Sequence, residues 1–351
     1  MTAEIVTVVV NGQPFTGWKR VVIQSAVKHA AVSASLGVAA TLGATAIHKL
    51  FALGAPAQIY AGSDLALDGY IDGRHPRFNA GEAEIIVRLR SKAQDAIDCS
   101  AAPKNSEMQN VTPLQIAQGL DSFGIGFFSS AQMTPIPTFR VTKGESVFRA
   151  VERACREQGL TLCGRPGGVE LWSAKTQPPR HAGGLVEGVN IEIGEADHDS
   201  SNRHSEIRVH GQAARGHGAG ATQIEGLSVD ATIARYRPKI IAHEGDTNPQ
   251  RALGKAQSLR DRAAGEGIKA LVSTPVWRDE AGTLWTPGYR IWTESPFLDV
   301  TQDMVVEHLI LAQDAEAGTE ARLGLVDPRA YGGAGGKGDK SGSGWKMPSD
   351  S

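Results

Sequence analysis

Cysteine is scarce in this chain of 351 residues, which contains only Cys99, Cys155 and Cys163. An odd number of cysteines without a Cys-x-x-Cys pair argues against a disulfide framework and against a cysteine-based zinc site. The chain also lacks a surplus of one charge, because 36 basic residues stand against 38 acidic ones. No basic field is therefore expected to attract nucleic acid or an anionic membrane.

A secretory signal sequence is missing as well. The first ten residues contain Glu4, no basic residue and an alternating apolar pattern, so we expect synthesis and folding in a reducing cytoplasm. One uncharged run, residues 30–47, approaches the length of a membrane span. Its alanine, glycine, serine and threonine residues insert poorly into lipid, so we predict a buried strand pair or a subunit contact and no stable membrane insertion.

Glycine, by contrast, is abundant, with 41 residues, and favours turns and short strands over long helices. Residues 6–10, 21–23, 57–60, 65–71 and 84–90 have strand patterns, and Asn11-Gly12 is a hairpin turn signal. Several short strands separated by glycine predict a small β-barrel or sandwich over residues 1–100.

Residues 101–176 differ in pattern and are predicted to form a small α/β module. Thr112–Gln115 is a capping box with proline at the first helical position, and Thr142–Glu145 is a second capping box before an apolar helical stripe. Two short strands, residues 160–163 and 169–172, then flank a Pro-Gly turn.

The β pattern resumes in residues 177–245 and 266–330, with strands expected at 268–277, 284–292 and 305–311. A helix is predicted over 248–265, capped by Asn248. Residues 331–351 are rich in glycine, serine and lysine, so we predict a flexible tail. Trp345 and Met347 are its only large apolar residues, and they are the candidate partner contact. The sequence thus predicts a mainly β fold with α+β insertions.

Half of the ten histidines lie in a short stretch beside Asp197 and Asp199. These are His181, His198, His204, His210 and His217. A zinc site would need three or four of them to converge. His204, Glu206, Arg208 and His210 instead alternate with Ile207 and Val209, which favours a solvated strand face; the metal site stays open as the alternative.

Other candidates for chemistry are weak. No GxSxG, HExxH, Walker or strand-linked GxGxxG motif occurs, and Gly332–Lys337 lacks the spacing of a phosphate loop. Cys155 lies on an apolar helical stripe and is interpreted as a buried thiol. Asp68 and Asp72 could form a carboxylate pair, although a strand and turn explain them more simply. We therefore predict no catalytic site, no cofactor and no metal.

The second half of the chain is locally basic, with Arg203, Arg208, Arg215, Arg235, Arg237 and Lys239. Because aromatic residues do not interleave closely with them, a partner contact or solvated charge is favoured over DNA binding. Three tryptophans, Trp18, Trp277 and Trp285, stand at expected strand ends beside glycine or charged turns. We predict that they are structural anchors rather than parts of a ligand cage.

The order of segments resembles the baseplate hub proteins of Mu-like contractile-tailed phages, which are related to late-control D proteins and to the valine–glycine-repeat spikes of type VI secretion. The resemblance is carried, in order, by residues 6–23 (VTVVVNGQPFTGWKRVVI), 67–71 (LDGYI), 88–99 (RLRSKAQDAIDC), 112–125, 139–172, 185–193 (LVEGVNIEI), 205–212, 235–240 (RYRPKI), 277–278 and 282–287 (GTLWTP).

This resemblance implies two tube-type β-barrels per subunit and a homotrimer, so that six similar barrels join a sixfold tail tube to a threefold central spike. It also implies a structural role in the virion baseplate, assembly in the host cytoplasm, contacts with the tail tube protein, the spike and other baseplate proteins, and passage of phage DNA during DNA ejection. A spike or hub of a type VI or tailocin-like device, or a tail-tip cell-wall hydrolase, are the alternatives. A spike of that kind normally carries a C-terminal β-helical repeat, which this sequence does not show.

Overall fold

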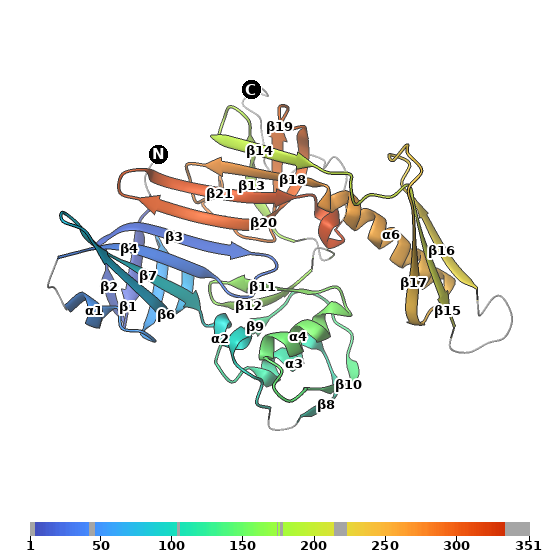
Figure 1. The fold of residues 1–351 in the computed structure, drawn as a ribbon, viewed down its shortest axis with the longest axis horizontal. Coiled ribbons are helices and arrows are strands. Elements are labelled where there is room, and N and C mark those ends of the chain that lie inside the picture. The colour runs from blue at the N-terminus through green and yellow to red at the C-terminus, as the bar shows by residue number, and fades with distance from the viewer. Residues whose placement is uncertain are drawn as a thin grey trace.

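The computed structural model describes residues 4–41, 46–103, 106–173, 175, 178–213 and 223–333. The fold is mainly β, with 49% of residues in strands and 17% in helices, as the sequence predicts. Figure 1 shows a long sheet, a small α/β module below it and a separate sheet on one side, attached through a helix. Among the described residues, no helix is both long and apolar enough to cross a membrane.

The main sheet contains thirteen strands, in the order β14-β18-β21-β20-β3-β4-β7-β6-β5-β1-β2, with β19 paired to β20 and β13 to β19. From the first half come β1 (Val6–Val10), β2 (Gln13–Phe15), β3 (Trp18–Ala26), β4 (Ser33–Ala40), β5 (Pro56–Ala61), β6 (Asp64–Phe78) and β7 (Ala83–Ser91). From the second half come β13 (Arg180–Val186), β14 (Ile193–His198), β18 (Ile268–Thr274), β19 (Arg290–Ser295), β20 (Val300–Asp314) and β21 (Gly318–Val326).

β20 and β3 join the two halves of the chain. They pair antiparallel from His308 opposite Ala26 to Asp314 opposite Arg20. One strand of each half therefore pairs with a strand of the other half, and the two halves form one sheet. Among the described strands no ladder closes the sheet into a barrel, and β2 and β14 each pair on one side only.

The first hairpin follows from its sequence. Val6, Val8 and Val10 are buried while the residues between them are partly exposed, so β1 places every second side chain in the core. Asn11 and Gly12 both have positive φ, 50° and 75°, as a tight two-residue hairpin requires. The predicted strand and turn are confirmed.

Only part of the uncharged run 30–47 is a strand. Residues 33–40 form β4 alone, between β3 and β7, and α1 (Ala46–Leu50) begins at the end of the run. The predicted strand pair is therefore wrong for the described residues. Ala34, Leu36 and Val38 enter the core, whereas Ser33, Ser35 and Gly37 lie between longer side chains of the neighbouring strands.

The α/β module forms most of a second hydrophobic core, which also includes Ala30 from the segment after β3. It comprises α2 (Ala93–Asp98), β8 (Glu107–Val111), α3 (Pro113–Leu120), β9 (Phe127–Phe128), β10 (Ile136–Arg140), α4 (Val147–Arg156), β11 (Thr161–Arg165) and β12 (Gly168–Trp172). The Thr112–Gln115 capping box is confirmed. The cap of α4, however, is Ser146, whose hydroxyl accepts from Arg149 N; Thr142 and Glu145 bond to each other one turn earlier.

A second sheet, which we call the arm sheet, is formed by β15 (Glu206–Gln212), β16 (Ile224–Val229) and β17 (Pro238–Asp246). It shares no ladder with the main sheet, although the sequence grouped these residues with 266–330. The predicted helix is present as α6 (Pro249–Glu266), capped by Asn248. Ala252 and Ala256 pack against Ile207 and Val209 of the arm sheet.

Two strand predictions near the C-terminus need correction. β18 ends at Thr274 because Pro275 follows, and the strand expected at 284–292 begins only at Arg290 because Pro287 has no amide hydrogen to donate to a ladder. β21 was not predicted. The last element is the short 3₁₀ helix η2 (Pro328–Tyr331). The predicted tail lies outside the described residues from position 334 on, with Trp345 and Met347.

Candidate functional surface

One face of the main sheet covers the core, and the other, which we call the open face, carries small and polar side chains. Cross-strand rows define it. Gln24 on β3 lies opposite Ile310 and Ser33, and Ser33 lies opposite Arg90. The next row joins Ala312, Val22, Ser35 and Arg88. Since β20 takes part in both rows, the open face runs across both halves of the chain.

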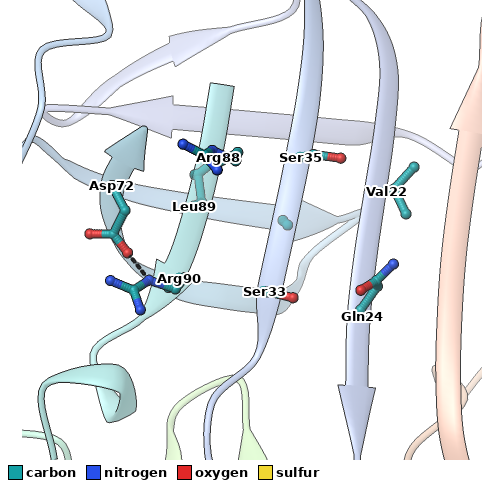
Figure 2. Close-up of a pocket in the computed structure, with 9 residues that line it drawn as sticks. Val22, Gln24, Ser33, Ser35, Asp72, Arg88, Leu89 and Arg90 are labelled. Atoms are coloured by element: carbon teal, nitrogen blue, oxygen red, sulfur yellow. Dashed lines mark hydrogen bonds and ion pairs between the residues drawn. The ribbon is translucent and has the colours of Figure 1, made fainter. Parts of the chain in front are cut away.

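A shallow hollow of about 460 Å³ lies on this face, and Figure 2 shows the residues that line it. Its floor is formed by Val22, Gln24, Ser33 and Ser35, and Arg88, Arg90 and Asp72 lie along one side. Arg90 forms ion pairs with Asp72 and, at 3.1 Å, with Asp98. Arg88 has no hydrogen-bond or ion-pair partner among the described residues.

Glycines on the open face make room for long side chains. A Cβ on Gly73 would lie 2.6 Å from an Arg88 Nη atom, and one on Gly324 would overlap the His308 ring. Arg88 and His308 therefore lie flat against the strands beside them. Arg88 and Arg90 are the charged side chains of the two described rows; Arg90 is balanced by Asp72 and Asp98, and Arg88 is not.

Arg278, in the loop between β18 and β19, bonds three residues of the N-terminal strands and the segment before them. Its guanidinium bonds both carboxylate oxygens of Glu4 at 2.9 Å, Asp64 at 2.5 Å and the carbonyl oxygen of Ala61 at 2.7 Å. These hydrogen bonds, chiefly those that Arg278 donates to Glu4, raise the pKa of Arg278 above its already high value. Arg278 therefore fastens the 275–289 loop to the N-terminal strands.

A buried pair that sequence analysis missed, His181 and Asp279, lies in the same region. His181 Nδ1 is 2.9 Å from Asp279 Oδ2, and His181 Nε2 accepts from the backbone N–H of Thr286 at 3.1 Å. Burial raises the pKa of Asp279, but hydrogen bonds from His181 and from backbone amides outweigh it and hold that pKa below its ordinary value. With both imidazole nitrogens bonded internally, the pair links β13 to the loop.

The tryptophans singled out by the sequence occupy different environments. Trp277 is 1% exposed, and its indole N–H donates to the carbonyl oxygens of Ala312 and Glu320 at 3.2 and 2.9 Å. Trp285 is buried against the His181 ring and donates to the Val276 carbonyl at 2.9 Å. Trp18 is only partly buried at the main core, and its N–H has no partner among the described residues.

The candidate metal and catalytic residues lie apart. His181 is buried beside Asp279, His198 bonds the Leu298 carbonyl at 2.8 Å, and His210 lies on the arm sheet; His217 is outside the described residues. No group of three histidine, cysteine or acidic residues in the described chain could hold a metal. The solvated face is confirmed for Glu206, Arg208 and His210, since Ile207 and Val209 between them are buried.

The carboxylate and thiol candidates have structural surroundings. Asp68 pairs with Lys92 at 2.5 Å and Asp72 with Arg90, so the two carboxylates have separate cations. Burial raises the pKa of Cys155 to about 12 and that of Cys163 to about 11, which keeps both thiols protonated. Cys99 is exposed.

Several of the basic residues in the second half stabilise the arm sheet. Arg203 bonds Asp230 at 2.7 Å, and Arg208 bonds Glu225 at 2.8 Å and Glu206 at 3.1 Å. Arg237 donates to two carbonyl oxygens, those of Ser200 and Ser201. The side chains of Arg235 and Lys239 have no hydrogen-bond or ion-pair partner among the described residues, and Arg215 lies outside them.

Comparison with known proteins gives the class to which this architecture belongs. Residues 5–91 match the Mu phage baseplate assembly protein GpP-like family (N-terminal part), and residues 93–171 match the second domain of the gp44-like baseplate hub family. The chain is 27% identical over 340 residues to the baseplate hub protein gp44 of Escherichia phage Mu, covering 93% of this chain and 88% of gp44.

Two solved structures share the fold. The 43 kDa tail protein of prophage MuSo2 from Shewanella oneidensis has a TM-score of 0.78 and 22% identity, covering 93% of this chain and 99% of that protein. A type VI secretion component of E. coli, described as similar to the T4 tail proteins gp27 and gp5, has a TM-score of 0.56 and 12% identity, covering 91% of this chain and 76% of that one.

The fold and these matches define a structural component of the phage tail baseplate. The chain belongs to the gp44-like baseplate hub family of Mu-like phages. Members of this family are structural and typically non-enzymatic, and membership implies neighbours in the baseplate. The resemblance stated from the sequence is confirmed.

Proposed function

We propose that three copies of this hub form a ring that adapts a sixfold tail tube to a threefold central spike. Each chain would contribute two tube-type units, one of residues 1–100 and one of residues 177–245 and 266–330, with module 101–176 outside them. The observation that carries this proposal is the β20–β3 ladder, which joins the two halves of a hub-family chain into one sheet. Three such chains supply six sheet units around one axis.

We propose further that the open face lines the channel through which phage DNA passes. A wall of this kind must not hold DNA, because every phosphate that a cation neutralises adds affinity through counterion release. The properties of the face support this proposal: Arg90 is neutralised by Asp72 and Asp98, Arg88 is the one cation of the two described rows without such a partner, and Ser33, Ser35 and Ala312 are small. Transient passage is then favoured over binding.

The alternative, a hub or spike of a type VI or tailocin-like device, is supported by the shared fold with the E. coli type VI component. A tail-tip hydrolase has less support, since the carboxylates Asp68 and Asp72 are each bound to a cation. We propose that the protein has no catalytic activity. A peptidoglycan turnover assay on the assembled tail, with and without this protein, tests that statement, and hydrolysis that depends on the chain would overturn it.

Electron cryomicroscopy of assembled tails tests the main proposal. We expect three copies in one ring, with the open face toward the axis and the tail tube and spike on opposite sides. Six copies, a single copy, or an open face turned outward would overturn it.

A further inference from the structure

Two edges of the molecule have opposite charge and exposed apolar side chains. The first, the acidic edge, comprises β14 and the turn before it. Residues 187–199 contain five acidic and no basic residues. Val189 and Ile193 are 71% and 68% exposed, and β14 pairs only with β18. An unpaired, exposed edge strand of this kind is a template for another chain.

A hollow lies beside this strand. It has a volume of about 410 Å³ and is lined by Glu195, Asp197 and Glu307 together with Lys269 and His308. The carboxylates of Glu195 and Asp197 have no hydrogen-bond or ion-pair partner in the described part of the chain. The hollow therefore combines two free carboxylates with space for a cationic side chain.

The second surface, the basic edge, comprises the start of β17 and the turn before it. Residues 231–241 contain Arg235, Arg237 and Lys239 and no acidic residue. Tyr236 and Ile240 are 75% and 67% exposed, and β17 is one of the two outer strands of the arm sheet. Arg235 and Lys239 are free of partners, as noted above, whereas Arg237 bonds the backbone.

The two edges do not cover each other within one chain, since their apolar side chains are exposed. In Figure 1 the arm sheet lies to one side of the main sheet, beyond α6. A surface that fits a different surface of an identical subunit makes a head-to-tail contact, and such a contact closes into a three-membered ring when neighbouring subunits are related by a 120° rotation about one axis. Building on the trimer proposed above, we propose that the basic edge of one subunit binds the acidic edge of a second copy of this chain.

Charge reversal in the assembled tail tests this contact. Variant R235E/K239E and variant E195K/D197K should each reduce incorporation of the hub into tails about tenfold, because each places like charges across the interface. The four substitutions together should restore incorporation. The matched control, R251E/R262E, reverses two exposed cations of α6 and should leave incorporation unchanged.

Crosslinking gives a second readout that does not depend on loss of assembly. In a Cys99→Ser background, Glu195→Cys with Lys239→Cys should give linked dimers and trimers with a short bismaleimide. Glu195→Cys with Arg251→Cys should not. If tails contain three copies but the reversals have no effect and no link forms, the edge contact is refuted and the trimer stands. A copy number other than three refutes the trimer itself.

Discussion

Truncation of Trp277 should destabilise the second half of the main sheet. The side chain is 1% exposed, contacts the main core, and bonds two carbonyl oxygens where β20 pairs with β21. Replacing a buried tryptophan with alanine typically costs about 3–5 kcal/mol, since apolar burial is lost and a cavity remains. For a unit of about 250 residues, roughly 2 °C is lost per kcal/mol, so the melting temperature of Trp277→Ala should fall by about 6–10 °C.

Differential scanning calorimetry of the purified protein measures this effect. Trp277→Phe separates two contributions in part, because it removes the N–H donor and keeps most, though not all, of the buried apolar area. Phe297→Ala is the matched control: its ring is 87% exposed, so its melting temperature should stay within about 1 °C of the parent. If Trp277→Ala also melts within about 2 °C of the parent, Trp277 is no anchor and the reasoning fails.

Four further outcomes are expected. The pKa of Asp279 is lowered in the folded protein, so its contribution to the free energy of unfolding is present above the unfolded pKa of about 4 and is lost as the pH falls through the folded pKa. The difference in stability between the parent and Asp279→Asn, measured in urea, should therefore be wide at pH 7 and should narrow as the pH falls below about 4. A constant difference would contradict the charged pair. A maleimide at neutral pH should label one thiol per folded chain, that of Cys99, and three in denaturant; rapid labelling of Cys155 or Cys163 in the folded protein would show that they are accessible. Gly226→Ala should destabilise the arm sheet because a Cβ there would overlap the backbone of α6 at Ala252 and Leu253, whereas Gly254→Ala, with open space around it, should stabilise α6 by about 0.5–1 kcal/mol; equal effects in urea titrations would be inconsistent with this packing. Deletion of residues 332–351 should leave the melting temperature within about 1 °C, while Trp345→Ala or Met347→Ala should weaken attachment of one neighbouring tail protein; full infectivity of tails without these residues would show that the segment is dispensable.

Local sequence signals predicted individual elements well where the deciding interactions are also local. The Asn11-Gly12 turn, the Thr112 capping box and the Asn248 cap are all present. Each depends on contacts within a few residues. The predicted strand boundaries were wrong where a distant partner determines them. The 275–289 loop, for example, is held by hydrogen bonds from Arg278 to Glu4 and Asp64, more than two hundred residues earlier in the chain.

The candidate surface was less accessible to sequence reasoning. The serines and glycine of residues 33–37 indicated only a strand of small residues, because their position on the open face depends on which side chains lie opposite them in β3 and β7. His181 and Asp279 are 98 residues apart, and neither lies in a motif. The edges around β14 and β17 showed local charge, which pointed to a partner contact without showing which strands are unpaired.

The amino-acid sequence by itself determined the β-rich class, the α/β module, the helix α6 and membership of the hub family, because these rest on short-range periodicity, caps and the order of segments. Tertiary structure alone decided that β20 pairs with β3, that β15–β17 form a separate sheet, and which face of the main sheet stays open. Strand pairing between distant segments depends on long-range ladders and on the burial of one whole face. Many partners satisfy an alternating pattern equally well, and only the packed core selects among them.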